Sequence, residues 1–260
     1  MSCTEPNLQN IPVRQALGRT LRKAFVAGEG HIFVGADYSQ IELRLMAHLS
    51  GDENLISAFN NEEDIHRKTA SRVFNIDYDK VTREDRSRAK AVNFGIIYGM
   101  SGFGLAQDIH VSRKQAEEYI SDYFDKHPAV KKYLDNSVKS ARENHYSETI
   151  LGRRRYINEI SSPNYMTRQL GERLAMNSPI QGSAADIIKI AMRDVYREIR
   201  ERGLESRLVL QIHDELIIES AEDEKDQIEE LLKRNMEGAM ELSVRLTCDM
   251  NSADNWYDLK

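Results

Sequence analysis

The chain has 260 residues, of which 40% are hydrophobic and 30% charged, with a formal net charge of −6. This length predicts one large domain or two small ones, and no apolar run approaches the roughly 20 residues of a membrane-spanning helix, which argues against a membrane protein. Two cysteines, Cys3 and Cys248, and a start without a signal-peptide pattern argue against a disulfide framework or a cysteine zinc cluster and indicate the cytoplasm.

The first half of the chain predicts one strand and several helices. An apolar run at 32–36 predicts a short buried strand that ends in Asp37. Thr82 is a candidate cap for a longer helix that we expect to run to about Tyr98. Shorter helices are predicted at 41–49, 53–60 and 64–74.

The second half predicts further helices and one hairpin. Pro179 separates two of the helices, because proline lacks the N–H that a helix needs. A short extended piece is expected at 147–157. Two apolar runs, 208–212 and 215–218, flank a polar break and predict a buried hairpin. The predicted helices are 112–125, 128–144, 164–177, 181–202 and 222–240. The expected fold class is therefore α+β, rich in helices and with a small sheet.

Two aspartates occupy fixed points of the predicted strands. Asp37 ends the buried strand, and Asp214 lies at the tip of the hairpin. If these carboxylates were side by side they could bind a pair of Mg²⁺ ions, which stabilise the attacking and leaving oxygens of a phosphoryl transfer. Acids at strand ends and turns are common, so a structural role is the alternative for either residue.

The helix that starts at Thr82 carries two cations and two aromatic residues at steps of four. Arg86, Lys90, Phe94 and Tyr98 therefore form a stripe along one side, since four residues are slightly more than one helical turn. Cations can hold a triphosphate while aromatic rings stack on a base. The alternative is a solvated charged end that leads into a buried aromatic end.

A third group has the same spacing. Arg173, Asn177 and Gln181 could read hydrogen-bond acceptors in a minor groove, which are nearly the same for every base pair. Helix capping and ordinary surface polarity are the alternative. The run of arginines at 153–155 is either a solvated charge cluster or a site for backbone phosphates.

Charge is distributed unevenly along the chain. Residues 7–28 hold four cations and no acid, and residues 151–181 hold five arginines against two acids. Residues 221–241 hold eight acids against three cations. Because phosphate contacts come from Lys and Arg, basic binding faces can coexist with an acidic outer helix in a chain of negative net charge.

Taken together, these segments resemble the family A DNA polymerases. The resemblance covers motif A at residues 37–44, DYSQIELR; motif B at 86–99, from Arg86 to Gly99; and motif C at 211–216, QIHDEL. The opening segment at 5–12, EPNLQNIP, is also similar to the family. The stretches occur in the family's order, and the similarity runs from about residue 4 to residue 260.

The resemblance implies a role for each residue around the nucleotide. Asp37 and Asp214 would bind two Mg²⁺ ions, with the backbone carbonyl of Tyr38 as a further ligand and Glu215 in support. Lys90 would also donate a proton to the leaving pyrophosphate. The residues implied to bind the deoxynucleoside triphosphate are Arg86, Lys90, His66, Phe94, Tyr98, Glu42 and Gln40. Within this set, Glu42 would exclude a ribose 2′-hydroxyl and Tyr98 would stack at the templating position.

The resemblance also implies contacts to primer-template DNA. Arg173 and Gln181 would follow the minor groove near the primer end, and His213 would lie by the primer terminus. The remaining residues implied to bind DNA are Asn177, Asn7 and Asn10.

The implied fold has a palm at 1–50 and 151–260 and fingers at 51–150. The implied activity is template-directed DNA synthesis in replication and repair, by a monomer in the bacterial cytoplasm at the nucleoid. The family's thumb and exonuclease domains have no counterpart in these residues. We therefore expect a partial enzyme that gains activity when it is joined to an N-terminal thumb and palm portion.

Two other functions compete with this hypothesis. A two-metal nuclease would explain Asp37 and Asp214 but not the stripe from Arg86 to Tyr98, which suits a nucleoside triphosphate. A non-catalytic nucleic-acid-binding fragment would keep the surface and lack synthesis. Lengthening of a labelled primer would indicate a polymerase, and shortening would indicate a nuclease. Asp214→Ala would abolish synthesis by a polymerase, whereas a non-catalytic fragment would keep its DNA binding and have no synthesis to lose.

Overall fold

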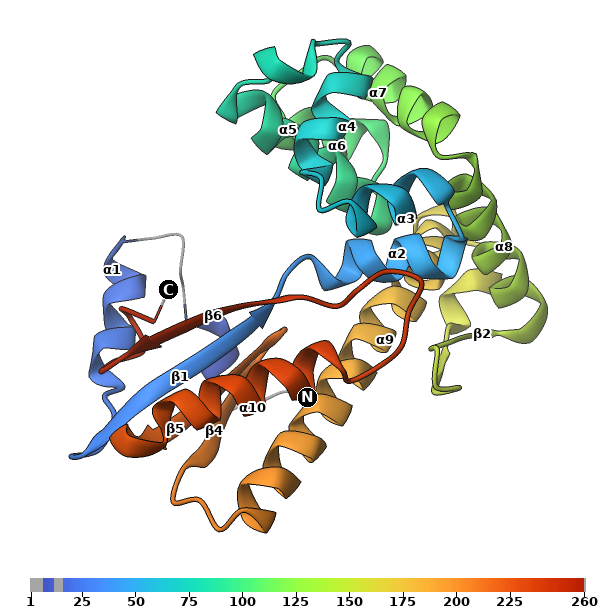
Figure 1. Ribbon diagram of the computed structural model, residues 1–260. Helices are drawn as coiled ribbons and strands as arrows, with labels where there is room; N and C mark the ends of the chain where they lie inside the picture. Colours follow the sequence, from blue (N-terminus) through green and yellow to red (C-terminus); the bar gives the residue numbers. More distant parts are fainter. Residues whose placement is uncertain (1–6, 12–15, 260) are drawn as a thin grey trace. The chain divides into compact units, whose positions relative to one another are not determined.

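The structure is a computed structural model that describes residues 7–11 and 16–259 (Figure 1). Cys3 lies outside the described residues, as do Glu5, Pro6 and Pro12 of the opening segment and Arg14, one of the four cations at 7–28. The chain divides into two compact units. The sheet unit comprises Met1–Ile41, Ala185–Glu241 and Leu246–Lys260, and the helical unit comprises Glu42–Ala184 and Leu242–Arg245. These boundaries differ from the predicted palm and fingers segments, because residues 42–50 and 151–184 cluster with the helical unit.

The sheet unit is built on a four-stranded antiparallel sheet in the order β4-β5-β1-β6. The predicted strand is β1 (His31–Tyr38), and the predicted hairpin is β4 (Arg207–Ile212) with β5 (Glu215–Ala221). The strands β1 and β5 lie in the middle of the sheet, and most of their side chains are buried. Their continuous apolar runs are typical of strands covered on both faces.

The edge strand β6 (Cys248–Ala253) was not predicted. Its sequence, CDMNSA, has no apolar run, and apolar and polar residues alternate only over the four residues from Cys248 to Asn251. It becomes a strand because its main chain pairs with β1, from Tyr38 opposite Cys248 to Phe33 opposite Ala253. Tertiary pairing therefore decides this element, in spite of its weak local preference.

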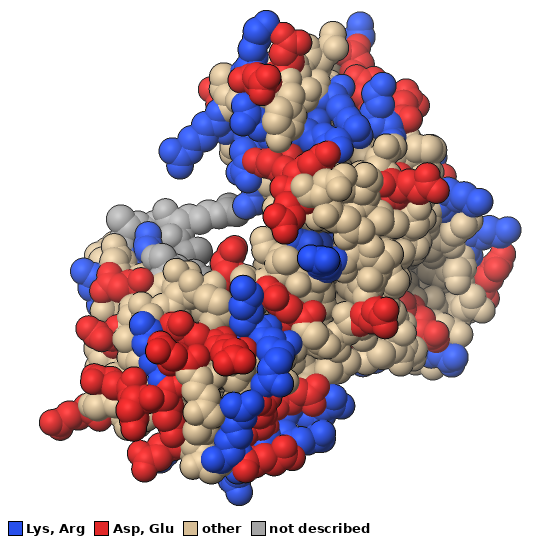
Figure 2. All heavy atoms as spheres, in the orientation of Figure 1, with Lys and Arg blue, Asp and Glu red and all other residues tan. Residues whose placement is uncertain are grey.

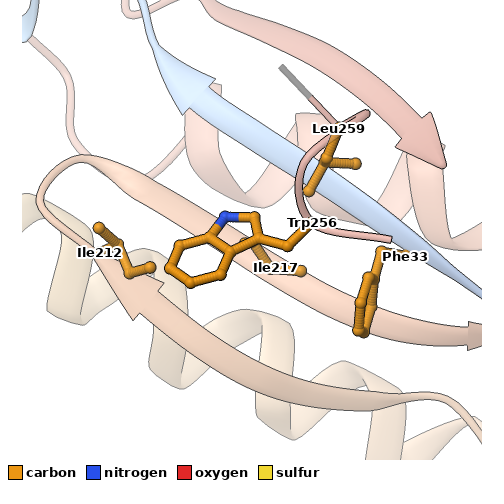
Figure 3. Packing of buried hydrophobic residues seen from close by; sticks show 5 residues of the cluster. All are labelled: Phe33, Ile212, Ile217, Trp256 and Leu259. Carbon is orange, nitrogen blue, oxygen red and sulfur yellow. The ribbon is translucent and has the colours of Figure 1, made fainter. Parts of the chain in front are cut away.

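One face of the sheet is covered by a cluster around Trp256 (Figure 3). Trp256 is 1% exposed and lies between Ile212 and Phe33 in this view. Gly35 in β1 allows the close packing, since a Cβ there would lie 2.8 Å from Leu259. Burying side chains of this size contributes roughly 1.5–3 kcal/mol each, so the cluster is a main source of stability for the sheet unit.

The predicted polar helix is α10 (Lys225–Glu237), which packs against β1, β5 and β6. Its buried residues are Ile228, Leu231, Leu232 and Met236, and its other side faces solvent. Figure 2 shows acidic side chains gathered over this part of the sheet unit. The expected acidic outer helix is thus present. The sheet unit also contains α1 (Ala16–Thr20), η1 (Leu8–Asn10), η2 (Leu21–Ala24) and η5 (Glu222–Glu224).

The helical unit contains most of the predicted helices. They are α2 (Ile41–Ser50), α3 (Glu53–Asn60), α4 (Ile65–Val73), α5 (Arg83–Ile97), α7 (Arg113–Lys126) and α8 (Pro128–Asn144). The unit also holds the short elements η3 (Tyr78–Lys80), β2 (Tyr146–Glu148), β3 (Arg154–Tyr156) and η4 (Asn158–Ser161). The predicted cap Thr82 is confirmed, because its side chain and that of Asp85 form a reciprocal capping box.

One helix of this unit, α6 (Gly102–Asp108), was not predicted. Its first turn contains two glycines, which disfavour helix formation. The Ser101 hydroxyl accepts a hydrogen bond from the Gly104 N–H at 3.3 Å and caps the helix start. Packing of α6 against α5 and α7 then holds a segment of poor helix propensity.

The prediction that Pro179 separates two helices was wrong. A single helix, α9 (Tyr165–Glu201), runs through the proline. Pro179 cannot bond the carbonyl of Ala175, but the Ser147 hydroxyl in β2 donates to that carbonyl at 3.3 Å. The Ser183 hydroxyl in turn donates to the Pro179 carbonyl at 2.5 Å. The side chain of a residue distant in sequence therefore replaces the missing helix bond.

Among the described residues, no helix combines the length and the apolar character needed to cross a bilayer.

Candidate active site

Main-chain pairing brings Asp37 and Asp214 to the same end of two neighbouring strands. Asp37 lies opposite Glu215 in the β1–β5 register, and the Tyr38 N–H donates to the Asp214 carbonyl at 3.1 Å. Asp214 lies in the two-residue turn between β4 and β5, in which His213 has a φ of 52°. The main chain of Asp214, at the predicted hairpin tip, is therefore bonded to the end of β1.

The side chains at this end of the sheet differ in burial. Asp37 and Asp214 are partly exposed, whereas Glu215 is buried. The Tyr38 hydroxyl donates to the Met236 carbonyl at 2.6 Å, and burial raises the pKa of this phenol far above its usual value. Because the Tyr38 side chain is bonded to α10, the backbone carbonyl of Tyr38, and not its hydroxyl, is the candidate ligand at this end of β1.

The donors at this end suit a hard divalent cation. Mg²⁺ prefers oxygen ligands and is typically held by one or two carboxylates together with substrate phosphates. Asp37, Asp214 and the Tyr38 carbonyl offer such oxygens. Over residues 7–11 and 16–259, no group of three or more His, Cys, Asp or Glu side chains could hold a metal alone. A site that is completed by substrate phosphates fits this arrangement.

A pocket of about 330 Å³ lies beside Asp214 within the sheet unit. Two arginines that were not predicted as site residues line it. Arg22 is 6% exposed, and its guanidinium lies 4.1 Å from the centre of the Trp256 ring. The Arg19 guanidinium lies 4.6 Å from the centre of the Tyr257 ring. The basic segment at 7–28 was the signal for them. The other residues lining the pocket are Gln9, Ile11, Ile212, His213 and Tyr257.

In the helical unit, the predicted stripe runs along α5 to its C-cap, Tyr98, and is partly exposed to solvent. Lys90 and Tyr98 are exposed, and Arg86 and Phe94 are partly buried. The Phe94 and Tyr98 rings are 6.2 Å apart with an interplanar angle of 25°, and the Lys90 ammonium lies 5.9 Å from the Phe94 ring centre. The opposite side of the helix is buried, as expected, through Ala89, Val92, Ile96 and Ile97.

Both ends of this stripe bond to carboxylates on other helices. The Arg86 Nε donates to Asp64 at 2.6 Å, and the Tyr98 hydroxyl donates to Glu42 at 2.7 Å. Burial by itself raises the pKa of Asp64, but the bonds from Arg86 and the Arg67 amide outweigh burial and lower that pKa. Burial raises the pKa of Glu42, and the hydrogen bond from Tyr98 opposes this shift only in part.

His66 lies beside the stripe but is only 2% exposed. Its ring centre is 6.1 Å from that of Phe94, and its Nδ1 is 3.0 Å from the Asn93 amide nitrogen. Burial lowers the pKa of His66 to about 4, with further lowering by the charges of Arg86 and Lys90. The imidazole is therefore neutral at pH 7.

The unbroken helix α9 keeps Arg173, Asn177 and Gln181 on one side. Arg173 and Gln181 are exposed, and Asn177 is partly buried. The end of α5 packs directly against this helix, because a Cβ at Gly99 would lie 3.3 Å from the Arg173 Cγ. Gly99 has a φ of +62°, which also favours glycine at this position. The structure thus brings the third predicted group next to the aromatic end of the stripe.

The arginine run at 153–155 lies beside the same part of α9. Arg153 donates to the Gly182 carbonyl at 2.9 Å, and Arg154 pairs with Glu148 at 2.9 Å. Arg155 is exposed on β3. Two members of the run therefore have structural contacts, and the third faces solvent.

The remaining predicted residues belong to the sheet unit. Asn7 precedes η1 and Asn10 is its last residue, and the Asn10 N–H donates to the Asn7 carbonyl at 3.2 Å. Gln40 precedes α2 with a φ of 56°. The side-chain carbonyls of Asn7 and Gln40 are buried without a hydrogen-bond partner among the described residues.

The comparisons with known proteins agree with these motifs. A profile described as DNA polymerase family A matches residues 1–258. DNA polymerase I of Caldicellulosiruptor bescii is 54% identical over 260 residues, which are 100% of this chain and 31% of that protein. DNA polymerase I of Bacillus subtilis is 50% identical over 261 residues, 100% of this chain and 30% of that protein. The chain thus spans about 30% of the length of these curated relatives.

A solved structure is similar over nearly the whole chain. It is the POL domain of Pol1 from M. smegmatis in complex with DNA primer-template and dNTP. The TM-score is 0.95 at 48% sequence identity, over 99% of this chain and 46% of that one. With a family profile that matches almost every residue and a shared fold, this chain belongs to the family A DNA polymerases.

Proposed function

We propose that this chain carries the nucleotidyl-transfer site of a template-directed DNA polymerase. The observation that carries the proposal is the main-chain pairing that holds Asp37 and Asp214 at adjacent strand ends, with 3.1 Å between the Tyr38 nitrogen and the Asp214 carbonyl. In this proposal the sheet unit belongs to the palm, and α3 to α8 form the fingers.

The reaction transfers a nucleotide to the primer 3′-hydroxyl. The hydroxyl gives up its proton to water, its oxygen forms a bond to the α-phosphorus of a deoxynucleoside triphosphate, and the bond from that phosphorus to the pyrophosphate oxygen breaks. Asp37, Asp214 and the Tyr38 carbonyl would hold two Mg²⁺ ions, which supply charge stabilisation for the attacking and leaving oxygens. Lys90 donates a proton to the leaving pyrophosphate. Positioning and charge neutralisation carry most of the catalysis in such reactions.

The helical unit supplies the nucleotide contacts in this proposal. Arg86, Lys90 and His66 bind the triphosphate, and Phe94 packs against the sugar and base. Bonding of Arg86 to Asp64 uses the guanidinium Nε. A bound triphosphate would therefore share the Arg86 guanidinium with Asp64 or displace Asp64 from it. Tyr98 stacks at the templating position, and Glu42 and Gln40 complete the nucleotide site, with Glu42 excluding a 2′-hydroxyl.

The DNA contacts complete the proposal. Arg173, Asn177 and Gln181 follow the minor groove, and His213 lies by the primer terminus, with Asn7 and Asn10 nearby on the palm. Shared minor-groove acceptors would let these side chains bind every base pair without sequence preference. We also propose that the enzyme acts as a monomer at the bacterial nucleoid in the cytoplasm. Gel filtration with light scattering tests the monomer.

Primer extension tests the function directly. We would incubate a labelled primer-template with the four deoxynucleotides, with and without Mg²⁺, using the chain alone and a chimera. In the chimera, the chain replaces the matching segment of the B. subtilis DNA polymerase I, which is 50% identical. We expect Mg²⁺-dependent lengthening, and stronger activity in the chimera. A shortened primer would indicate a nuclease, and an inactive chimera beside an active parent would contradict the proposal.

A further inference from the structure

A buried chain of hydrogen bonds links α4 to α5 behind the predicted stripe. The Thr69 hydroxyl donates to the Asn93 side-chain oxygen at 3.1 Å. The Asn93 side-chain nitrogen lies 3.0 Å from the His66 Nδ1. Thr69 and His66 are 4% and 2% exposed, and Asn93 is fully buried. Water therefore has little access to compete for these bonds.

These hydrogen bonds determine which imidazole nitrogen of His66 carries the proton. Because the Asn93 oxygen accepts from Thr69, its NH₂ group faces His66 and can only donate. The His66 Nδ1 must then accept, and a neutral imidazole that accepts at Nδ1 has its N–H at Nε2. In the described part of the chain, no residue forms a hydrogen bond with that second nitrogen.

The charges around His66 keep the ring neutral. Arg86 and Lys90 on α5 disfavour the imidazolium, and burial does so more strongly, whereas Asp64 at the start of α4 favours it. The result is a single uncharged N–H beside two cations. Such a donor adds a directional hydrogen bond for an anionic oxygen without adding a third positive charge to a site that already has two.

We propose that Asn93 is a positioning residue that fixes the Nε2–H tautomer of His66 and so makes this N–H available to a phosphate oxygen of the incoming nucleotide. The inference rests on the proposed function for the nature of the ligand, and on the Thr69–Asn93–His66 geometry for the tautomer. A side chain that presents both an acceptor and a donor is required at 93. Aspartate would instead accept from Nδ1–H and reverse the tautomer, and leucine would leave Nδ1 without its donor.

Nuclear magnetic resonance tests the tautomer without reference to activity. In the chain labelled with ¹⁵N-histidine, the His66 signals are assigned by their loss in His66→Gln. We expect an unprotonated Nδ1 and a protonated Nε2 at pH 7. In Asn93→Asp, which has nearly the same shape, we expect a protonated Nδ1. A protonated Nδ1 in the original chain, or an unchanged Nδ1 in Asn93→Asp, would overturn the inference whether or not the chain makes DNA.

Steady-state kinetics in the chimera test the link to the nucleotide. Loss of a hydrogen bond to a charged group predicts that Asn93→Leu raises the KM for deoxynucleotides about tenfold. Since Asn93 would act through His66, Asn93→Leu should add little in a His66→Ala background. An equal rise in KM in both backgrounds would show that Asn93 only supports the fold. Thr69→Val, which removes the donor to Asn93, should give an intermediate effect.

Discussion

The sheet unit holds its predicted catalytic groups through the main chain, whereas the helical unit holds them through side chains. Asp37 and Asp214 are placed by strand register and by the bond from the Tyr38 N–H. The stripe on α5 is instead held by bonds from Arg86 to Asp64 and from Tyr98 to Glu42. A side-chain substitution in the first case should remove chemistry and leave geometry intact. In the second case it should also change the charge or position of a neighbour.

The largest expected effect is in the sheet unit. Asp214→Ala removes one of the two proposed metal-binding carboxylates, and we predict a loss of at least about 10³-fold in kcat for primer extension, because metal binding supplies several kcal/mol of transition-state stabilisation. The main-chain bond to Tyr38 does not depend on the Asp214 side chain, so the variant should still fold. Asp226→Ala, an exposed aspartate on α10, is the matched control. Loss of folding in Asp214→Ala would show that the Asp214 side chain, and not only the main chain, holds these strand ends together.

The next effect belongs to the helical unit. Lys90→Ala removes the proposed proton donor, and general acid catalysis predicts a fall in kcat of about 10²-fold or more. Lys90 is also one of the cations that lower the pKa of His66, so this pKa should rise from about 4 in the variant. Lys114→Ala, an exposed lysine on α7, serves as the control. Unchanged kcat together with an unchanged His66 titration would show that α5 does not work as a connected set.

Sequence reasoning was strongest where local pattern decides the structure. Apolar runs located β1 and the hairpin of β4 and β5, and a period of four located the stripe on α5. It failed where contacts with residues distant in sequence decide the structure. The edge strand β6 depends on pairing with β1, and α9 crosses Pro179 with the help of Ser147. No local pattern predicts either partner.

The candidate site shows the same division. Roles for Asp37, Asp214 and Arg86 could be predicted from motifs, but the contacts of these residues could not. Arg22 lies against Trp256, at the other end of the chain, and this packing places it in the pocket beside Asp214. Asn93 was missed because a buried asparagine within motif B has no periodic signal. Its role follows only from the contacts with His66 and Thr69.

A stability test addresses the side-chain support of α9. Ser147→Ala leaves the Ala175 carbonyl without its donor, and we predict that the free energy of unfolding in urea falls by about 1–2 kcal/mol. In a Pro179→Ala background the same substitution should cost less, since an alanine at that position would supply the missing N–H. Ser137→Ala, which removes a bond to a carbonyl within α8, is the control. Equal costs in both backgrounds would show that Ser147 does not compensate for the proline.

The smallest effect concerns the charge of Glu42. Burial raises its pKa in the folded chain above the ordinary value of 4.5, and the Tyr98 hydroxyl opposes this shift. Well below pH 4.5 the carboxyl is protonated in both the folded and the unfolded chain, and burial carries no ionic penalty. As the pH rises above 4.5, the unfolded chain releases this proton more readily than the folded chain, so Glu42 destabilises the fold increasingly until its folded pKa is passed.

Glu42→Gln tests this sign, because glutamine keeps an acceptor for Tyr98 and cannot ionise. We predict that the unfolding free energy of Glu42→Gln, relative to the original chain, is higher at pH 7 than at pH 4. The comparison between the two pH values cancels the change in packing that the substitution causes at both. Urea unfolding at each pH measures it, with Glu84→Gln at the exposed start of α5 as control. A difference that falls with pH would mean that Tyr98, and not burial, determines the ionisation of Glu42, and that side-chain bonding holds the helical unit more tightly than the structure indicates.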